Sequence, residues 1–244
     1  MRTMERRKVV LWISMVYIIS FACYVPMMLR QQGVSVPQPL LYLKYGFVLT
    51  PALVTILFLS YERRLRACFT GSLHRISRRE AGICAAAALT GSFITFAASF
   101  IEKRDLFGEA YRSIALLVSG CAYLFATAAA EEMAWRGFLL QQTRSKGKQV
   151  VDGIFTGIIW AFWHIPMWVI RNGLRISGIL PLFIWTVLVS VVLGAVYAAF
   201  RNLLSVSLLH MILNVCFLAP VQYNVFIVCL GIVVCRSFRK LKPA

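Results

Sequence analysis

Long apolar runs separated by short polar segments make up most of this chain. Each run approaches the roughly 20 residues that an α-helix needs to cross the hydrocarbon core of a bilayer. The pattern therefore predicts an all-α fold, a polytopic transmembrane helix bundle of about eight spans. The expected spans lie near residues 9–29, 41–60, 82–101, 113–135, 151–170, 179–200, 203–218 and 221–235.

The last two runs are short and are separated only by Ala219 and Pro220. They form either two spans joined as a tight hairpin or one broken, partly re-entrant segment. The sequence leaves both arrangements open.

Composition supports a membrane protein without a separate soluble domain. Hydrophobic residues make up 60% of the chain and charged residues 14%, against about 25% charged residues in an average soluble domain. We therefore predict one membrane-embedded domain over residues 1–244.

The net charge of +17 would suggest nucleic acid in a soluble protein. Here 19 of the 26 basic residues fall in the two terminal segments and every second connection between the predicted spans, namely 1–8, 61–80, 136–150, 201–202 and 236–244. The positive-inside rule then places both termini in the cytoplasm and favours an even number of spans. We expect no nucleic-acid partner. Segment 61–80, which is rich in arginine, is either a solvated topogenic loop or a contact with membrane lipids.

An acidic pair, Glu131 and Glu132, ends the fourth apolar run. Ionisable residues at membrane depth cost several kcal/mol, so they mark candidate functional sites. Glu132 and Arg136 are four residues apart and share a helix face, where they can pair. Glu131 is rotated by about 100° around the helix from Glu132, so it can point away from the arginine and take part in chemistry. The alternative is a topological salt bridge at the cytoplasmic end of the span.

Two further polar positions lie inside apolar runs. His164 is in the fifth run, beside Pro166, and His210 with Asn214 share one helix face in the seventh. Both sets are compatible with plain hydrogen bonding between packed helices. Packing alone gives no reason for Glu, His, His and Asn to be the polar contents of three separate helices.

These residue types suit hydrolysis of a carbonyl compound. A Glu and a neutral His that converge on a water form a general base, and a second His with an Asn can donate to a developing oxyanion. Alternatively, Glu131, His164 and His210 could bind Zn²⁺, which lowers the pKa of bound water to about 7. The sequence has no HExxH motif, so a zincin arrangement is absent.

Three motifs in order resemble the CAAX-processing and bacteriocin-processing (CPBP, or Abi) family of intramembrane proteases. They are EExxxR at 131–136, aromatic-xxx-His at 160–164 and HxxxN at 210–214. The family usually has Phe at the aromatic position, whereas this chain has Trp160. The resemblance covers about a third of the chain, within helices 113–218 that we expect to form the catalytic core.

The resemblance implies an endopeptidase whose active site lies in the bundle core and opens to the cytoplasm. Glu131 and His164 would activate water, and Glu132 and Arg136 would orient their helix. The other two motif residues, His210 and Asn214, would stabilise the tetrahedral intermediate. The family has been described both as metalloproteases and as glutamate-type proteases, and we favour the glutamate type, with no resident cofactor and Zn²⁺ as the alternative.

The family also implies the setting. Its members trim prenylated CaaX proteins in eukaryotes and act in bacteriocin self-immunity, leader-peptide processing and membrane regulation in bacteria. We expect a multi-pass protein of the bacterial cell membrane and a membrane-associated peptide substrate. The rival hypothesis is a non-catalytic immunity or regulatory protein, or a small transporter, that uses the same polar cluster as a binding site or proton relay.

Two structural expectations follow from the depth of these residues. Glu131 can meet His164 only if the fourth helix continues past Arg136 or a water-filled cavity opens from the cytoplasm. We predict that the helix continues through about Gln141, with Arg144, Lys146 and Lys148 at the interface. A second expectation concerns a small-xxx-small pair, Gly153 and Gly157, which could let the fifth helix pack closely enough for His164 to reach the site. Generic helix packing is equally compatible with the pair.

Overall fold

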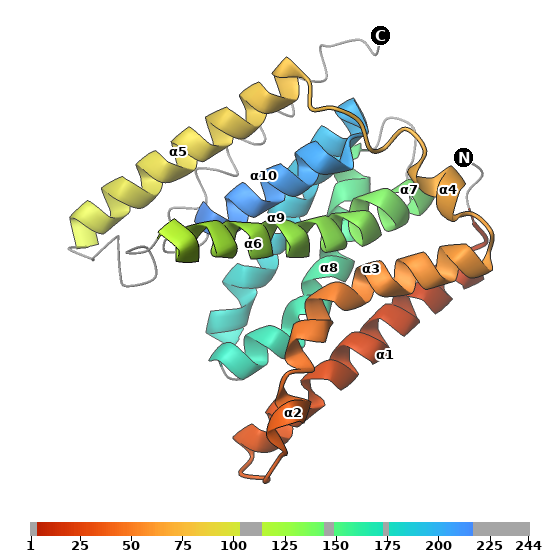
Figure 1. Ribbon diagram of the computed structural model, residues 1–244, viewed down its shortest axis with the longest axis vertical. Coiled ribbons are helices and arrows are strands. Elements are labelled where there is room, and N and C mark those ends of the chain that lie inside the picture. Colours follow the sequence, from red (N-terminus) through yellow and green to blue (C-terminus); the bar gives the residue numbers. More distant parts are fainter. Residues whose placement is uncertain (1–3, 103–113, 144–148, 173–175, 217–244) are drawn as a thin grey trace. The chain divides into compact units, whose positions relative to one another are not determined.

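A computed structural model describes residues 4–102, 114–143, 149–172 and 176–216, and every regular element in these ranges is a helix (Figure 1). This confirms the predicted all-α class. The elements in chain order are α1 (Arg6–Gln31), α2 (Gln38–Leu41), α3 (Lys44–Tyr61), α4 (Leu65–Phe69), α5 (Arg78–Glu102), α6 (Ile114–Ala134), the π-helical turn η2 (Trp135–Leu139), α7 (Leu140–Thr143), α8 (Gln149–Asn172), α9 (Ile176–Phe200) and α10 (Leu203–Cys216).

Each of the first seven predicted spans coincides with one of the longer helices. Within the described residues, four helical stretches are long and apolar enough to cross a membrane: Arg6–Gln31, Lys44–Tyr61, Gln149–Ile170 and Ser177–Phe200. A shorter apolar helix covers Leu203–Val215. The predicted run at 221–235 lies outside the described residues, so the number of spans stays a prediction.

The chain divides into two compact units. The first comprises Met1–Thr70 and Ala130–Gly194, and the second comprises Gly71–Ala129 and Ala195–Ala244. Two of the three boundaries fall within α6 and α9, and the third follows α4, between Thr70 and Gly71. The single membrane-embedded domain stays a prediction, and the units are described one at a time.

Aromatic side chains build the core of the first unit. Trp12 on α1 meets Trp135 edge to face, with ring centroids 5.8 Å apart, and Phe47 on α3 stacks on Trp163 of α8 at 4.1 Å. All four rings are fully excluded from solvent. The buried indole N–H of Trp163 donates to the hydroxyl of Ser20 over 2.8 Å, because a buried indole needs an acceptor. These contacts fix α8 against α1 and α3.

Close packing of α8 on α9 depends on two glycines, also within the first unit. A Cβ on Gly153 would lie 2.9 Å from Cα of Val191, and one on Gly157 would lie 2.9 Å from Cα of Val187 and 2.8 Å from Cβ of Ser190. Real Cβ atoms essentially never approach other atoms this closely. The close helix packing expected of the small-xxx-small pair is confirmed, and its part in bringing His164 to a site stays a prediction.

In the second unit α5 packs against α10, and side chains cap both helices at their N-termini. Ser77 and Glu80 form a capping box, in which the Ser77 N–H donates to Glu80 Oε2 (2.7 Å) and the Glu80 N–H donates to Ser77 Oγ (3.3 Å). Asn202 Oδ1 accepts the N–H of Leu204, and its amide donates to the carbonyl of His74. Polar loops are thereby tied to the starts of two apolar helices.

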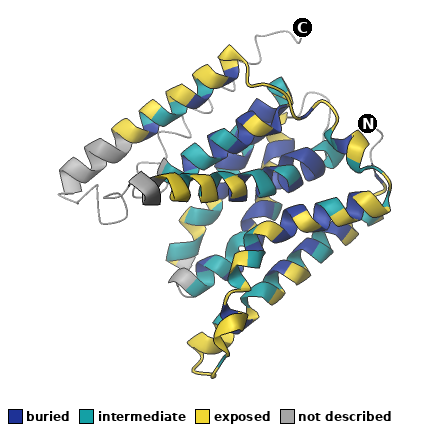
Figure 2. Ribbon diagram, viewed as in Figure 1, coloured by how far each residue is buried: buried dark blue, intermediate teal, exposed yellow. Residues whose placement is uncertain are grey.

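Burial along α6 changes in one direction (Figure 2). Residues 118–120 are exposed, whereas Glu131 and Glu132 are buried. The acidic pair therefore lies at the enclosed end of its helix.

Candidate functional site

The acidic motif lies on an unbroken helical segment. Helix α6 passes directly into the π-helical turn η2 and then into α7, so the backbone is helical through Thr143. This confirms the expected continuation through Gln141. The predicted interface residues Arg144, Lys146 and Lys148 lie outside the described residues.

The π-helical turn itself was not predicted. It begins at Trp135, three residues after Glu132, and shifts the hydrogen-bond pattern of the helix by one residue. The carbonyl of Gly137 accepts hydrogen bonds from the thiol of Cys68 on α4 (3.3 Å) and from the side-chain amide of Gln141. Single π-turns of this kind often mark functional sites. Here the side chains of Cys68 and Gln141 both bind the Gly137 carbonyl of the turn.

Glu132 and Arg136 form the predicted i,i+4 ion pair. Nη1 of Arg136 lies 2.7 Å from Oε1 of Glu132, and both side chains have no solvent exposure. A charge at this burial is tolerated only when it is paired. The pair neutralises both charges within one helical turn.

Glu131 points to a different neighbour, the indole of Trp160 on α8. Nε1 of Trp160 donates to Oε2 of Glu131 over 2.7 Å. The guanidinium carbon of Arg136 lies 4.6 Å from the centroid of the same indole, which is a cation–π geometry. Glu131 and Trp160 are 6% and 3% exposed. Trp160 thus contacts both the carboxylate of Glu131 and the guanidinium of Arg136.

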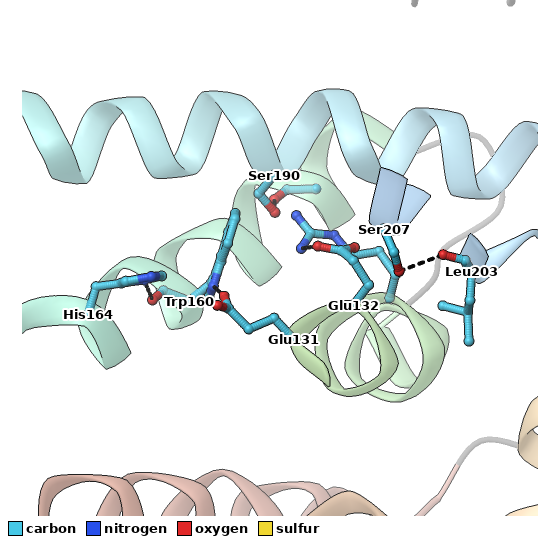
Figure 3. A network of polar contacts seen from close by, with 9 residues as sticks. Glu131, Glu132, Trp160, His164, Ser190, Leu203 and Ser207 are labelled. Carbon is cyan, nitrogen blue, oxygen red and sulfur yellow. Dashed lines mark hydrogen bonds and ion pairs between the residues drawn. The ribbon is translucent and has the colours of Figure 1, made fainter. Parts of the chain in front are cut away.

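His164 follows one helical turn after Trp160 (Figure 3). Its Nδ1 lies 2.9 Å from the carbonyl oxygen of Trp160. A carbonyl oxygen only accepts hydrogen bonds, so Nδ1 carries a proton in this contact. In the neutral tautomer with that proton, the ring's free lone pair is on Nε2. The ring stacks on Trp168 at 5.3 Å and meets Trp163 edge to face at 4.7 Å. These contacts fix both the tautomer and the ring plane.

The first unit therefore brings together four of the predicted site residues through Trp160, the aromatic residue of the second motif, for which the sequence predicted no role. The four are Glu131, Glu132, Arg136 and His164. In Figure 3, Trp160 lies between His164 and Glu131. Trp160 could have been singled out from the sequence. It is the aromatic residue of the second motif, four residues before His164, and its indole N–H is a hydrogen-bond donor that a phenylalanine at this position would lack.

His210 and Asn214 lie on α10, in the second unit. Their helical spacing is as expected; His210 is buried and Asn214 is half-buried. Their part in a site with Glu131 stays a prediction.

Glu131 and His164 are side chains that could serve either as a general base or as metal ligands. A histidine that ligates a metal through Nε2 usually donates its other N–H to a carbonyl or carboxylate, which is the arrangement at His164. Within the first unit, the described residues include no group of three His, Cys, Asp or Glu side chains placed to hold a metal ion. The third predicted ligand, His210, belongs to the second unit.

Comparison with protein families agrees with the motifs. A family model described as Rce1-like, type II CAAX prenyl endopeptidase Rce1-like, matches residues 112–216. This segment contains all three motifs and nearly the whole of the predicted catalytic core at 113–218. No curated protein matches the chain.

Proposed function

Because residues 112–216 belong to the Rce1-like family of CAAX prenyl endopeptidases, we propose that this protein is an intramembrane endopeptidase. Its substrate is a membrane-associated peptide or protein, with prenylated CaaX-type chains as the first class to test. One observation carries the proposal: Glu131 is buried and held by Trp160, one turn from His164, beside the closed Glu132–Arg136 pair.

In the proposed reaction, Glu131 takes a proton from a water positioned with Nε2 of His164. The resulting hydroxide attacks the carbonyl carbon of the scissile peptide bond. His210 and Asn214 donate hydrogen bonds to the oxyanion of the tetrahedral intermediate. The intermediate collapses as the C–N bond breaks, and Glu131 returns the proton to the leaving amine.

We favour a glutamate-type mechanism without a resident metal. The Trp160 N–H occupies one oxygen of Glu131, which suits a carboxylate held as a base. If Zn²⁺ were bound, Glu131, His164 and His210 would be the side chains to hold it, and it would supply Lewis-acid activation of water. Sensitivity to a chelator separates these two mechanisms.

We further propose that the chain crosses a bacterial cell membrane eight times, with both termini and the mouth of the site on the cytoplasmic side. The distribution of basic residues supports this orientation. Membrane lipids and the peptide substrate are its proposed partners, and nucleic acid is not one of them.

The decisive experiment is cleavage in proteoliposomes. The purified protein would be reconstituted and given a fluorogenic peptide that ends in a farnesylated CaaX sequence, together with a library of membrane-associated peptides. We expect the wild type to release a defined product, identified by mass spectrometry. Glu131→Gln and His164→Ala should release none above background.

Glu62→Gln is the matched control, because it makes the same chemical change at a carboxylate that pairs with Lys8 near the surface. It should cleave as fast as the wild type. Activity that survives a strong chelator supports the glutamate type. Cleavage by Glu131→Gln at the wild-type rate would overturn the proposed mechanism, and absence of cleavage of every peptide by the wild type would favour a non-catalytic binding protein.

A further inference from the structure

We propose that Trp160 is a positioning residue for Glu131. Its indole N–H holds Oε2 of the carboxylate, so that the other oxygen is directed at the water. This inference rests on the proposed function, in which Glu131 is the base. It assigns to the indole a task that goes beyond filling space between α6 and α8.

The contact has the geometry of a strong hydrogen bond. The Nε1 to Oε2 distance is 2.7 Å, at the short end for a donor facing a charged acceptor. Both residues are more than nine-tenths buried, and in such surroundings a hydrogen bond to a charge contributes more than it would in water. The contact therefore limits the rotation of the Glu131 side chain.

Trp160 is itself held by Arg136 and His164. Arg136 lies over its ring at 4.6 Å, and the arginine is fixed by its ion pair with Glu132. The backbone carbonyl of Trp160 accepts the hydrogen bond from His164. A rigid donor is needed for precise placement of a catalytic group. The same residue thus sets the position of Glu131 and the tautomer of His164.

A substitution at position 160 can separate the donation of a hydrogen bond to Glu131 from the filling of space between α6 and α8. A phenylalanine, usual here in the family that the motifs resemble, would keep an aromatic face for Arg136 but has no N–H. Trp160→Phe therefore removes the hydrogen bond while conserving an aromatic ring and the backbone carbonyl. The matched control is Trp12→Phe, because the buried indole of Trp12 donates to the hydroxyl of Thr55 over 3.1 Å, not to a carboxylate.

The first test measures steady-state cleavage in proteoliposomes. We expect Trp160→Phe to lower kcat about tenfold or more with KM changed less than twofold, since hydrogen bonds to charged groups are the strong ones. Trp12→Phe should change kcat less than threefold. If wild-type protein cleaves and Trp160→Phe keeps the wild-type kcat, the positioning role is wrong and the proposed function stands.

The second test needs no catalysis. In ¹H–¹⁵N spectra of the detergent-solubilised protein, the indole signal of Trp160 is assigned as the one that disappears in Trp160→Phe. We expect this signal at low field and shifted upfield in Glu131→Gln, while the Trp12 signal stays in place. A Trp160 signal that does not respond to Glu131→Gln would overturn the inference, whether or not the protein cleaves any peptide.

Discussion

Arg136 and Glu132 form an ion pair one helical turn apart in which neither side chain reaches solvent. The motif has three buried ionisable side chains, Glu131, Glu132 and Arg136, and the pair brings two of their charges together. It leaves Glu131 as the acidic side chain that turns toward α8. The arrangement separates a carboxylate held in an ion pair, Glu132, from the adjacent carboxylate that we propose as the base, Glu131.

Removing one member of the buried pair should destabilise the fold strongly. Arg136→Met leaves Glu132 charged and buried, at an expected cost of about 3–5 kcal/mol. The thermal midpoint in detergent should fall clearly, and less so in the double variant Glu132→Leu with Arg136→Met. Lys8→Met, which breaks the ion pair to Glu62 near the surface, should have a much smaller effect. An Arg136→Met protein as stable as the wild type would contradict this.

Substitution of the proposed oxyanion donors should lower turnover without abolishing folding. His210→Ala and Asn214→Ala are each expected to reduce kcat by about 10²–10³, the usual range for loss of one such donor. Rates with a fixed peptide and circular dichroism would be measured together. Ser207→Ala, at a buried hydroxyl of the same helix that bonds the Leu203 carbonyl, is the control. Unchanged kcat in both site variants would remove them from the mechanism.

Close packing of α8 on α9 can be tested at one glycine. Gly157→Ala places a methyl group 2.8 Å from Cβ of Ser190, so we expect a loss of about 1–3 kcal/mol from overpacking. Gly120→Ala is the matched control, because no atom lies within 4 Å of its Cβ position. That variant should be neutral or gain up to about 1 kcal/mol. Equal thermal midpoints for the two variants would contradict the close approach.

The capping box in the second unit should make stability depend on pH. Burial raises the pKa of Glu80, but hydrogen bonds from Ser77 and from the start of α10 outweigh it, so the pKa is lowered overall. A lowered pKa means that the stabilisation is complete above about pH 4.3, the value for an unfolded Glu, and is lost as the pH falls through the folded value.

The measurement is the thermal midpoint of wild type and Glu80→Gln between pH 3 and 8. We expect the wild type to be the more stable protein at pH 7, and the difference to shrink as the pH falls below that of the unfolded carboxyl. A difference that is independent of pH would show that the charge of Glu80 plays no part.

Cys68 should be chemically inert in the folded protein. Burial raises the pKa of its thiol to about 11, so only about one thiol in a thousand is ionised at pH 8. Peptide mapping after treatment with N-ethylmaleimide should find Cys68 unmodified in native protein and modified after unfolding in detergent. Rapid native labelling at Cys68 would mean that the contact with the Gly137 carbonyl opens readily.

Much of this architecture was predictable because its causes are local. A bilayer requires every backbone polar group to be paired within the segment, so long apolar runs are helices. The positions of α1, α3, α5, α6, α8, α9 and α10 follow from that rule. The Glu132–Arg136 pair was predictable for the same reason, since residues four apart on a helix are neighbours whatever surrounds them.

The links between helices were not predictable in this way. Trp160 and Glu131 are 29 residues apart in sequence, and their contact depends on how α6 and α8 pack. The π-helical turn at Trp135 likewise does not follow from the apolar pattern, whereas the carbonyl that accepts from His164 lies four residues earlier on the same helix. Motifs in the sequence determined which chemical groups this protein carries, whereas the tertiary structure decided which oxygen of Glu131 is held and by what, because a hydrogen bond between two helices depends on their packing.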